Sequence, residues 1–337
     1  MSVKALALSA IDRLNLYPLF HRYTRDTATV FMLHNFSPSE QPRPDTLTPA
    51  ILDNFFSYLQ KKQYTVLSLS DFVDALRDHE SLYKTVVFTV DDGFRDFYVH
   101  AFPVFKQYGY GATVFLTSDF IEGKLFFWWN QIEYAFMTTS HREITVDAAE
   151  IGHVSWRNED DRRRVISLVT ERFKRIPNER KLAAIEQLVR RLEVDISEQP
   201  TGVYAPLSWD EIKEMQAGGI DFHPHTKTHP ILTQIHTEQK RLEAAESKRV
   251  LEERLGGCRD IFCYPNGGAE DFDDEMIRIL KETGYRAAVT GLPGFDSTRG
   301  MTDLFRLRRF AIPESLPVFK EYVSGLERAK TNLLRRS

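Results

Sequence analysis

The sequence predicts an α/β fold, with a (β/α) barrel favoured over a doubly wound sheet. Short runs of β-branched and aromatic residues alternate with amphipathic segments, and this alternation stops at about residues 125–200. Repeated strand–helix units imply parallel strands joined by right-handed crossovers, and the number of units here favours a barrel. A length of 337 residues suits one barrel domain over 1–337 with an insertion at about 125–200, because such barrels need roughly 250 residues.

Seven runs have the composition of buried parallel strands, being short, rich in β-branched and aromatic residues and bounded by turns: 28–33, 64–69, 85–90, 111–116, 218–223, 260–265 and 286–291. Helical periodicity predicts helices between them at 48–62, 70–78, 95–108, 237–255 and 271–284. Ser70 is the predicted N-cap of the second helix, and Gly284 is the predicted C-cap of the last.

The segment 125–200 reads as a helical insertion on the barrel. LFFWWNQIEYAFM has aromatic residues at helical spacing, and EDDRRRVISLVTERFKRI and NERKLAAIEQLVRRLEV read as two charged amphipathic helices. We interpret their Arg and Glu runs as solvated faces. Trp128 and Trp129 are expected in the core of the insertion, with stacking on a sugar ring as the alternative role.

Composition excludes several classes of protein. The formal charge is −4, so the chain lacks the excess of positive charge that is typical of nucleic-acid-binding proteins. No run approaches the roughly 20 apolar residues of a membrane span. The first residues, MSVKALALSAIDRLNLY, become charged too early for a signal-peptide core, and Cys258 and Cys263 form no disulfide framework. We therefore expect a cytoplasmic enzyme. The basic tail RAKTNLLRRS is interpreted as a solvated helix end, with peripheral contact at the inner membrane face as the alternative.

Two short stretches carry the chemistry. Asp91 and Asp92 end the strand TVVFTV, at the carboxyl edge where α/β barrels place their active sites, and Gly93 permits a sharp exit. Like charges oppose the ionisation of both carboxylates unless a cation relieves them. His225 and His229 follow a later strand and, on a helical turn, would share one face. With Asp92 they can hold one divalent cation and leave positions for water and substrate, while Asp91 remains free as a base.

These motifs resemble the polysaccharide deacetylase family, the NodB-like carbohydrate esterases. F-T-V-D-D-G, H-T-K-T-H-P and F-C-Y-P-N-G-G occur in the family's order, and the similarity covers roughly residues 28–130 and 205–325. The resemblance implies a distorted (β/α) barrel that removes acetyl groups from N-acetylated sugars, or sometimes from O-acetyl esters. It assigns Asp92, His225 and His229 to the metal and Asp91 to the base.

The third motif implies further roles. A backbone N–H at Asn266 would stabilise the oxyanion, while Tyr264 and Pro265 would shape the wall of the site. The family's third motif usually has an arginine that braces the base and a tyrosine after the proline, and here these places hold Cys263 and Asn266. Arg309, or with less support Arg306, is the expected substitute brace.

The family's usual general acid, a histidine in a late motif, has no counterpart here, because no histidine follows His236. Another residue must take this role. His34, in TVFMLHNF, resembles the early Y-H motif of circularly permuted relatives. His34 is our candidate for protonating the leaving amine. The alternative interpretation is that His34 is a loop histidine without a catalytic role.

The sequence thus predicts a metal-dependent hydrolase that releases acetyl from an N-acetylated sugar of a glycan or glycan precursor. The substrate could be nucleotide- or lipid-linked. Imidazole and carboxylate ligands suit zinc, and cobalt or nickel nearly as well. Two alternatives stay open: hydrolysis of another C–N bond, in a formamide or cyclic amide, and a carbohydrate-binding homologue without catalysis.

Overall fold

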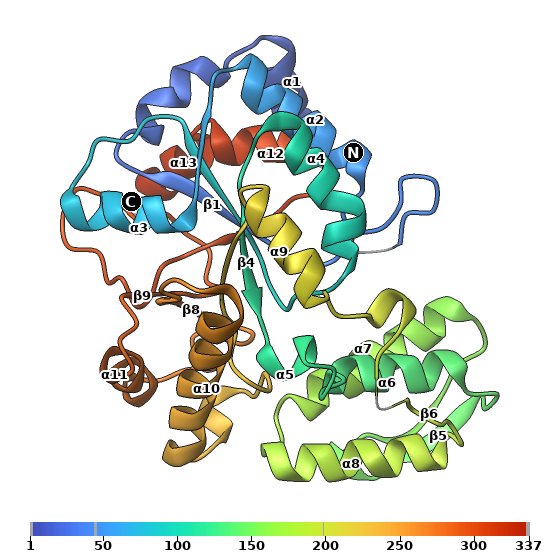
Figure 1. The fold of residues 1–337 in the computed structure, drawn as a ribbon. Coiled ribbons are helices and arrows are strands. Elements are labelled where there is room, and N and C mark those ends of the chain that lie inside the picture. Colours follow the sequence, from blue (N-terminus) through green and yellow to red (C-terminus); the bar gives the residue numbers. More distant parts are fainter. Residues whose placement is uncertain (1–2, 44–45, 198, 335–337) are drawn as a thin grey trace.

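A parallel sheet of six strands forms the centre of the molecule in the computed structural model, which describes residues 3–43, 46–197 and 199–334 (Figure 1). The order is β10–β1–β3–β4–β7, with β2 beside the first half of β3. The bounds are β1 Ala28–Leu33, β2 Thr65–Leu67, β3 Thr85–Val90, β4 Thr113–Leu116, β7 Asp221–Pro224 and β10 Phe310–Ala311. β3 is buried along its whole length, as the apolar run TVVFTV requires of a central strand.

Two further strands, β8 (Ile261–Cys263) and β9 (Ala287–Val289), form a separate parallel pair. β8 is linked to β7 through a side chain and not through a backbone ladder, because the backbone N–H of Ile261 donates to His223 Nδ1 at 3.3 Å. Beyond β9, residues 307–311 pair first with Val289 and then with β1. The strands therefore follow one another around a ring that is interrupted between β7 and β8, which is the expected distorted barrel.

Helices cover the outside of this ring: α2 Pro49–Lys61, α3 Leu69–Asp78, α4 Phe102–Tyr108, α5 Ser118–Ile121, α9 Trp209–Ala217, α10 Thr237–Leu255 and α11 Asp274–Glu282. The two ends of the chain pack together through α1 Val3–Arg13, the 3₁₀ helix η1 Tyr17–Thr24, α12 Leu316–Val323 and α13 Leu326–Leu334. Phe319 of α12 stacks on Phe55 of α2 with ring centroids 4.2 Å apart, which ties the C-terminal part to the barrel core. None of the described helices combines the length and the apolar character needed to cross a bilayer.

All seven predicted strands are confirmed, but several details differ. The N-cap of α3 is Ser68 and not Ser70, because the Ser68 hydroxyl accepts the Asp71 N–H. α11 has Thr283 as its C-cap, and Gly284 follows in the left-handed region. The predicted helix 95–108 starts with a π-helical turn, η2 Phe97–Ala101. The last residues of the basic tail, 335–337, lie outside the described range.

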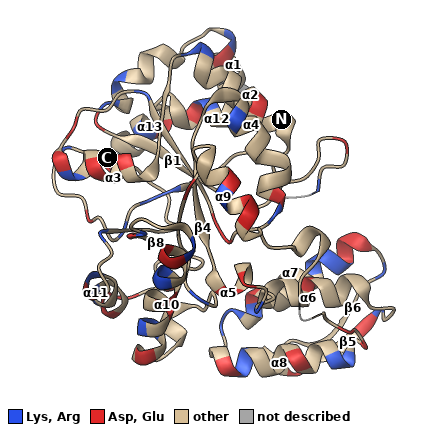
Figure 2. Ribbon diagram, viewed as in Figure 1, with Lys and Arg blue, Asp and Glu red and all other residues tan. Residues whose placement is uncertain are grey.

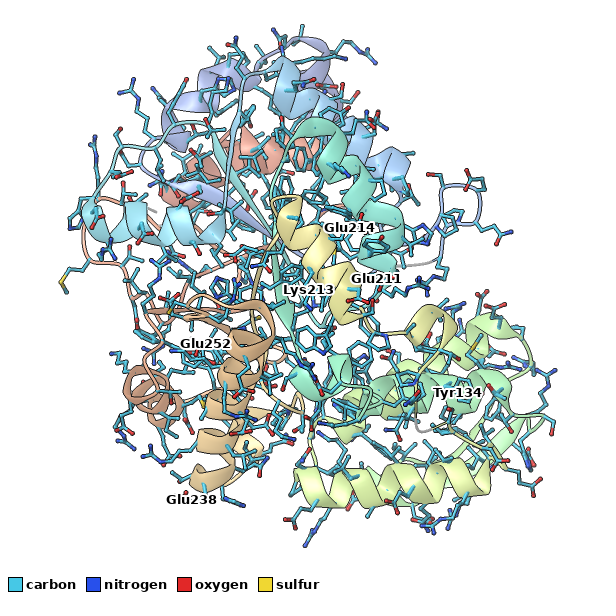
Figure 3. All side chains as sticks on the ribbon, in the orientation of Figure 1. Tyr134, Glu211, Lys213, Glu214, Glu238 and Glu252 are labelled. Carbon is cyan, nitrogen blue, oxygen red and sulfur yellow. The ribbon has the colours of Figure 1, made fainter. Side chains whose placement is uncertain are left out.

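α9 begins with a capping box in which Ser208 and Glu211 bond reciprocally to each other's backbone N–H. Figure 3 shows Glu211, Lys213 and Glu214 on this helix. Glu211 also pairs with Arg95 at 2.7 Å, so α9 is held to the segment that follows Asp91 and Asp92.

The insertion contains a β-hairpin as well as the predicted helices. It consists of α6 Trp128–Thr138, β5 Glu143–Val146, η3 Ala148–Glu150, β6 Gly152–Ser155, α7 Glu159–Phe173 and α8 Asn178–Arg191; η4 Gly202–Tyr204 leads back to α9, and η5 Leu232–Gln234 precedes α10. Its core is separate from that of the barrel and centres on Phe136, Trp156 and Phe173. Acidic and basic residues alternate along α7 and α8 (Figure 2).

Candidate active site

Asp91 and Asp92 lie at the carboxyl end of β3 and are almost completely buried. The Asp91 N–H donates to the Leu33 carbonyl at 3.0 Å, which extends the β1–β3 pairing to the edge of the site. Gly93 then turns the chain at φ +92°, and a Cβ there would lie 2.8 Å from the Leu116 side chain. Only glycine fits this exit, as the motif predicted.

His225 and His229 lie in the loop after β7, and not on a helical turn as we expected. The loop folds back because Thr226 and His229 adopt positive φ angles of 66° and 58°. Glu243, buried on α10, accepts the N–H groups of Lys227 and Thr228, each at 2.8 Å. This carboxylate fixes the loop, and no local sequence pattern indicates its role.

The two imidazoles converge on Asp92. Asp92 Oδ1 lies 3.5 Å from His225 Nε2 and 3.4 Å from His229 Nε2, and one ligand atom from each of the three residues lies within 4.8 Å of the others. The other nitrogen of His225 faces the Cys263 carbonyl at 2.9 Å, which orients the ring as it does for metal-binding histidines. His229 Nδ1 has no hydrogen-bond partner among the described residues.

The electrostatics of this cluster differ between its two histidines. Burial and the neighbouring His225 lower the pKa of His229 to about 3, so its imidazole is in the neutral form that a metal needs. Burial alone would lower the pKa of His225. The neighbouring Cys263, Asp92 and Asp91 outweigh this effect, so the pKa of His225 lies well above its usual value. Two imidazoles and a carboxylate, buried together, suit zinc and similar divalent ions.

Asp91 is held by a buried guanidinium. Arg309 Nη1 donates to Asp91 Oδ1 at 2.7 Å and Arg309 Nη2 to Asp91 Oδ2 at 2.8 Å, while Arg309 Nε donates to the Thr290 carbonyl at 2.8 Å. Burial raises the pKa of Asp91, but Arg309 lowers it more, so this carboxyl is ionised at neutral pH. Arg306 lies elsewhere and pairs with Asp303 at 2.8 Å.

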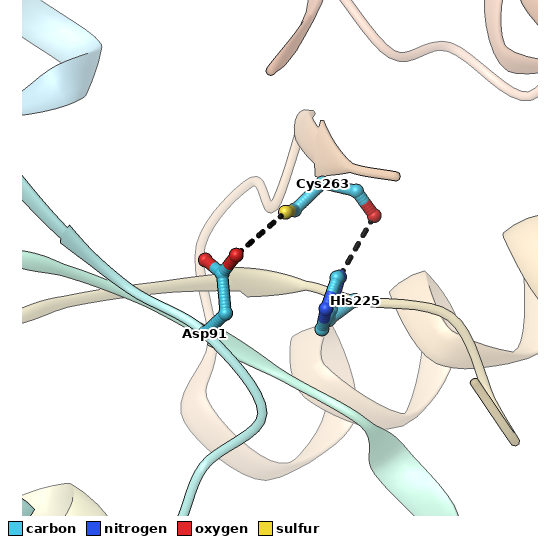
Figure 4. Close-up of side chains that lie close together, drawn as sticks. All are labelled: Asp91, His225 and Cys263. Atoms are coloured by element: carbon cyan, nitrogen blue, oxygen red, sulfur yellow. Dashed lines mark hydrogen bonds between the residues drawn. The ribbon is translucent and has the colours of Figure 1, made fainter. Parts of the chain in front are cut away.

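The Cys263 thiol completes the surroundings of Asp91. It donates a hydrogen bond to Asp91 Oδ2 at 3.5 Å and accepts one from Arg309 Nη2 at 3.2 Å. Figure 4 shows the contact with Asp91 as a dashed line. Asp91, His225 and Cys263 form a second group whose ligand atoms lie within 4.8 Å of one another. The Arg309 guanidinium bonds to two of the three, so its charge disfavours a cation there.

The other predicted site residues separate into two groups. His34 is half-exposed and places Nε2 3.7 Å from Asp91 Oδ2, and Asn266 lines the same cavity at φ 57°. Tyr264 and Pro265 do not line this cavity. Because alternate residues of a strand face opposite sides, Tyr264 points away, stacks on Phe272 with centroids 4.0 Å apart and donates to the Phe305 carbonyl. The prediction that these two residues form the wall is corrected accordingly.

Known proteins show the same combination of motifs and fold. The sequence profile of the family described as Polysaccharide deacetylase matches residues 79–288, more than half of the chain. The chain belongs to the polysaccharide deacetylase family. It is 23% identical over 257 residues to YxkH of Bacillus subtilis (strain 168), which also carries the family's name; the match covers 76% of this chain but only 60% of YxkH.

Solved deacetylases share the fold of this family member. The Streptococcus pyogenes deacetylase PplD superposes with a TM-score of 0.57 at 20% identity, covering 90% of this chain and 97% of PplD. A de-N-acetylase from Aggregatibacter actinomycetemcomitans gives 0.57 at 16% identity, covering 88% and 100%.

In this polysaccharide deacetylase family member, the insertion supplies one wall of the candidate active-site cavity. The cavity has a volume of about 360 Å³, and Trp128, Trp129, Thr170 and Lys174 line it together with the predicted polar residues. Trp129 packs on His229 with ring centroids 4.7 Å apart. Trp128 belongs to the core of the insertion, as expected, and also borders the cavity. Stacking of a tryptophan on a sugar ring stays a prediction. No sequence signal identified Thr170 or Lys174, since both lie in a helix that reads as solvated.

Proposed function

We propose that this chain is a metal-dependent hydrolase that removes an acetyl group from an N-acetylated sugar of a glycan or glycan precursor. One observation carries the proposal: three buried ligand groups surround a single point, and a separate, ionised carboxylate lies beside them. A site with three protein ligands and open positions is typical of catalytic metals. PplD, which shares this fold, was solved in complex with acetate, the product that the proposed reaction releases.

Asp92, His225 and His229 would hold the ion. Two imidazoles and a carboxylate favour zinc, with cobalt or nickel as alternatives. When bound, such an ion polarises the acetyl carbonyl and lowers the pKa of water at its open position. The metal-binding role is supported by the neutral His229 and by the orientation of His225 toward the Cys263 carbonyl.

Asp91 is the proposed base. Arg309 occupies both carboxylate oxygens, which fixes the side chain and keeps it ionised, so it can accept the proton of the attacking water. His34 is the proposed acid for the leaving amine, because it borders the same cavity close to Asp91 and is open to solvent. The backbone N–H at Asn266 is the proposed donor to the oxyanion.

The test is the release of acetate from N-acetylglucosamine oligomers by the zinc-loaded chain and by its Asp91→Asn variant. Loss of the base is expected to lower kcat by about 10²–10⁴-fold while zinc content stays the same. Unchanged turnover in this variant would remove Asp91 from the base role. A chain that binds zinc and sugar but releases no acetate would instead be the non-catalytic homologue.

A further inference from the structure

Asp96 is a buried carboxylate that lies outside the candidate active-site cavity. It follows the two aspartates of the site along the chain and directly precedes the π-helical turn η2. Its side chain is only 7% exposed, and it does not line the cavity. Aspartate is seldom buried in this way unless its carboxylate has partners. The partners of Asp96 therefore indicate what this side chain does.

Asp96 holds the backbone just beyond His34. Its Oδ2 accepts the Phe36 N–H at 2.8 Å. Arg43 Nη2 donates to the Phe36 carbonyl at 2.8 Å and lies 3.5 Å from the same oxygen of Asp96. The Phe36 ring is fully buried and packs on Phe97 with ring centroids 5.6 Å apart. Phe36 is thus fixed through its N–H, its carbonyl and its side chain.

The segment 91–96 anchors the chain on both sides of His34. Before His34, the Leu33 carbonyl accepts the Asp91 N–H at 3.0 Å. After His34, the next anchor is the hydrogen bond to Asp96. The two residues between these anchors both line the cavity. Because one segment supplies the proposed base and both anchors, it also sets the distance of 3.7 Å between His34 Nε2 and Asp91 Oδ2.

The hydrogen bond to Phe36 does not depend on the charge of Asp96. Burial raises the pKa of this carboxyl to about 7, although the Phe36 N–H and Arg43 oppose the change. A protonated carboxyl still has an oxygen that accepts an N–H. An asparagine would keep such an oxygen, whereas an alanine would remove it. Substitution by these two residues therefore separates the anchoring role from the charge.

We propose that Asp96 is a positioning residue that holds His34 where it can protonate the leaving amine. The inference rests on the proposed function and assigns no chemistry to Asp96 itself. When the C–N bond breaks, its electron pair stays on nitrogen, which takes the proton from His34 Nε2, while the acyl carbon leaves as acetate. Without the anchor at Phe36, His34 would be free to move, and a displacement of about 1 Å can lower a rate by about 100-fold.

Two substrates of the zinc-loaded chain test this role. The leaving amine of an N-acetylglucosamine oligomer needs a proton, whereas 4-nitrophenolate leaves from 4-nitrophenyl acetate without one. Asp96→Ala should lower kcat for the oligomer by about 10–100-fold and leave KM, zinc content and kcat for the aryl ester nearly unchanged. Asp96→Asn should recover most of the lost activity. The matched control is Glu40→Ala, which changes an exposed carboxylate in the loop after β1 and should have no effect.

A double variant shows whether Asp96 acts through His34. His34→Ala should have the same selective effect as Asp96→Ala, and the two changes together should lower kcat for the oligomer no further than His34→Ala alone. Equal losses for both substrates, or losses that add in the double variant, would overturn the positioning role. If Asp96→Ala does not fold, Arg43→Ala removes the bond to the Phe36 carbonyl and should show the same selective loss.

A spectroscopic readout separates this inference from the proposed function. In the zinc-loaded chain with isotope-labelled histidine, the His34 ring signal is assigned by its loss in His34→Gln. This magnetic resonance signal should shift or broaden in Asp96→Ala and return in Asp96→Asn, whether or not acetate is released. A signal that stays unchanged in Asp96→Ala refutes the positioning role alone. The expected shift without release of acetate from the oligomer refutes the proposed function alone.

Discussion

Arg309 and Asp91 form a buried ion pair between residues 218 positions apart. Removing one partner of such a pair leaves a buried charge without compensation. Arg309→Met is therefore expected to lower the free energy of unfolding by about 3–5 kcal/mol. Urea unfolding of the metal-free chain measures the loss.

The double variant Arg309→Met with Asp91→Asn serves as the control for this pair. It removes both charges and should recover a large part of the stability, because the remaining amide is far less costly to bury than a carboxylate. If the two single changes simply add in the double variant, the ion pair does not have the role described.

Among single residues, the sequence predicted the candidate site but not the contacts that support it. Asp91, Asp92, His225 and His229 could be predicted because each directly follows a run that reads as a strand, and parallel strands bring their carboxyl ends to one edge. The contact of the Cys263 thiol with Asp91 could not, because it depends on the packing of β8 against β3 and β7.

The loop that carries both histidines depends on an element distant in the sequence. Besides two backbone N–H groups, Glu243 of α10 accepts the Thr228 hydroxyl at 2.6 Å. Glu243→Ala would free the loop, so zinc affinity should fall by about 10–100-fold, as for other groups that support metal ligands. Zinc titration with a competing chelator measures this.

Glu238→Ala on the same helix is the matched control (Figure 3), because Glu238 is exposed and is expected to leave zinc affinity unchanged. Equal zinc affinities for the two variants would show that Glu243 does not hold the loop.

The burial of one residue of α8 could not be predicted from the helical pattern of the insertion. Its charged residues were interpreted as a solvated face, yet Lys181 is fully buried against Trp128 and its Nζ has no hydrogen-bond partner within the described residues. Helical periodicity indicates which positions share a face, but it does not reveal when a single polar position on that helix is covered by a neighbouring element.

This lysine predicts a pH dependence of stability. Burial lowers the pKa of Lys181 from 10.5 to about 8. Between these pH values the folded chain binds fewer protons than the unfolded chain, so the contribution of Lys181 to stability rises with pH, and below about pH 8 its full cost applies.

Lys181→Met should therefore raise the free energy of unfolding at pH 7 by on the order of 1–2 kcal/mol, after a partial loss of the contact with Trp128. The gain should disappear as the pH approaches 10.5. Lys213→Met, at an exposed position of α9, is the control, and its effect on the free energy of unfolding should show no such dependence on pH. A gain that does not change with pH would contradict the assignment.

At the scale of the whole molecule, the topology brings the site together. β3 leads to Asp91 and Asp92, β7 leads to the two histidines, and β4 lies between these strands. The alternation of strands and helices predicted this arrangement. The break between β7 and β8, and the orientation of the insertion over the site, depend on side-chain contacts such as Trp129 with His229, which the sequence does not show.

The central claim is that Asp92, His225 and His229 bind one cation and leave Asp91 free. Calorimetric titration of the metal-stripped chain with zinc tests it most directly. We expect one ion per chain, an affinity at least 100-fold lower in Asp92→Asn, His225→Gln and His229→Gln, and nearly unchanged binding in Cys263→Ser. Binding that persists in Asp92→Asn but disappears in Cys263→Ser would place the ion in the other ligand group and contradict the account.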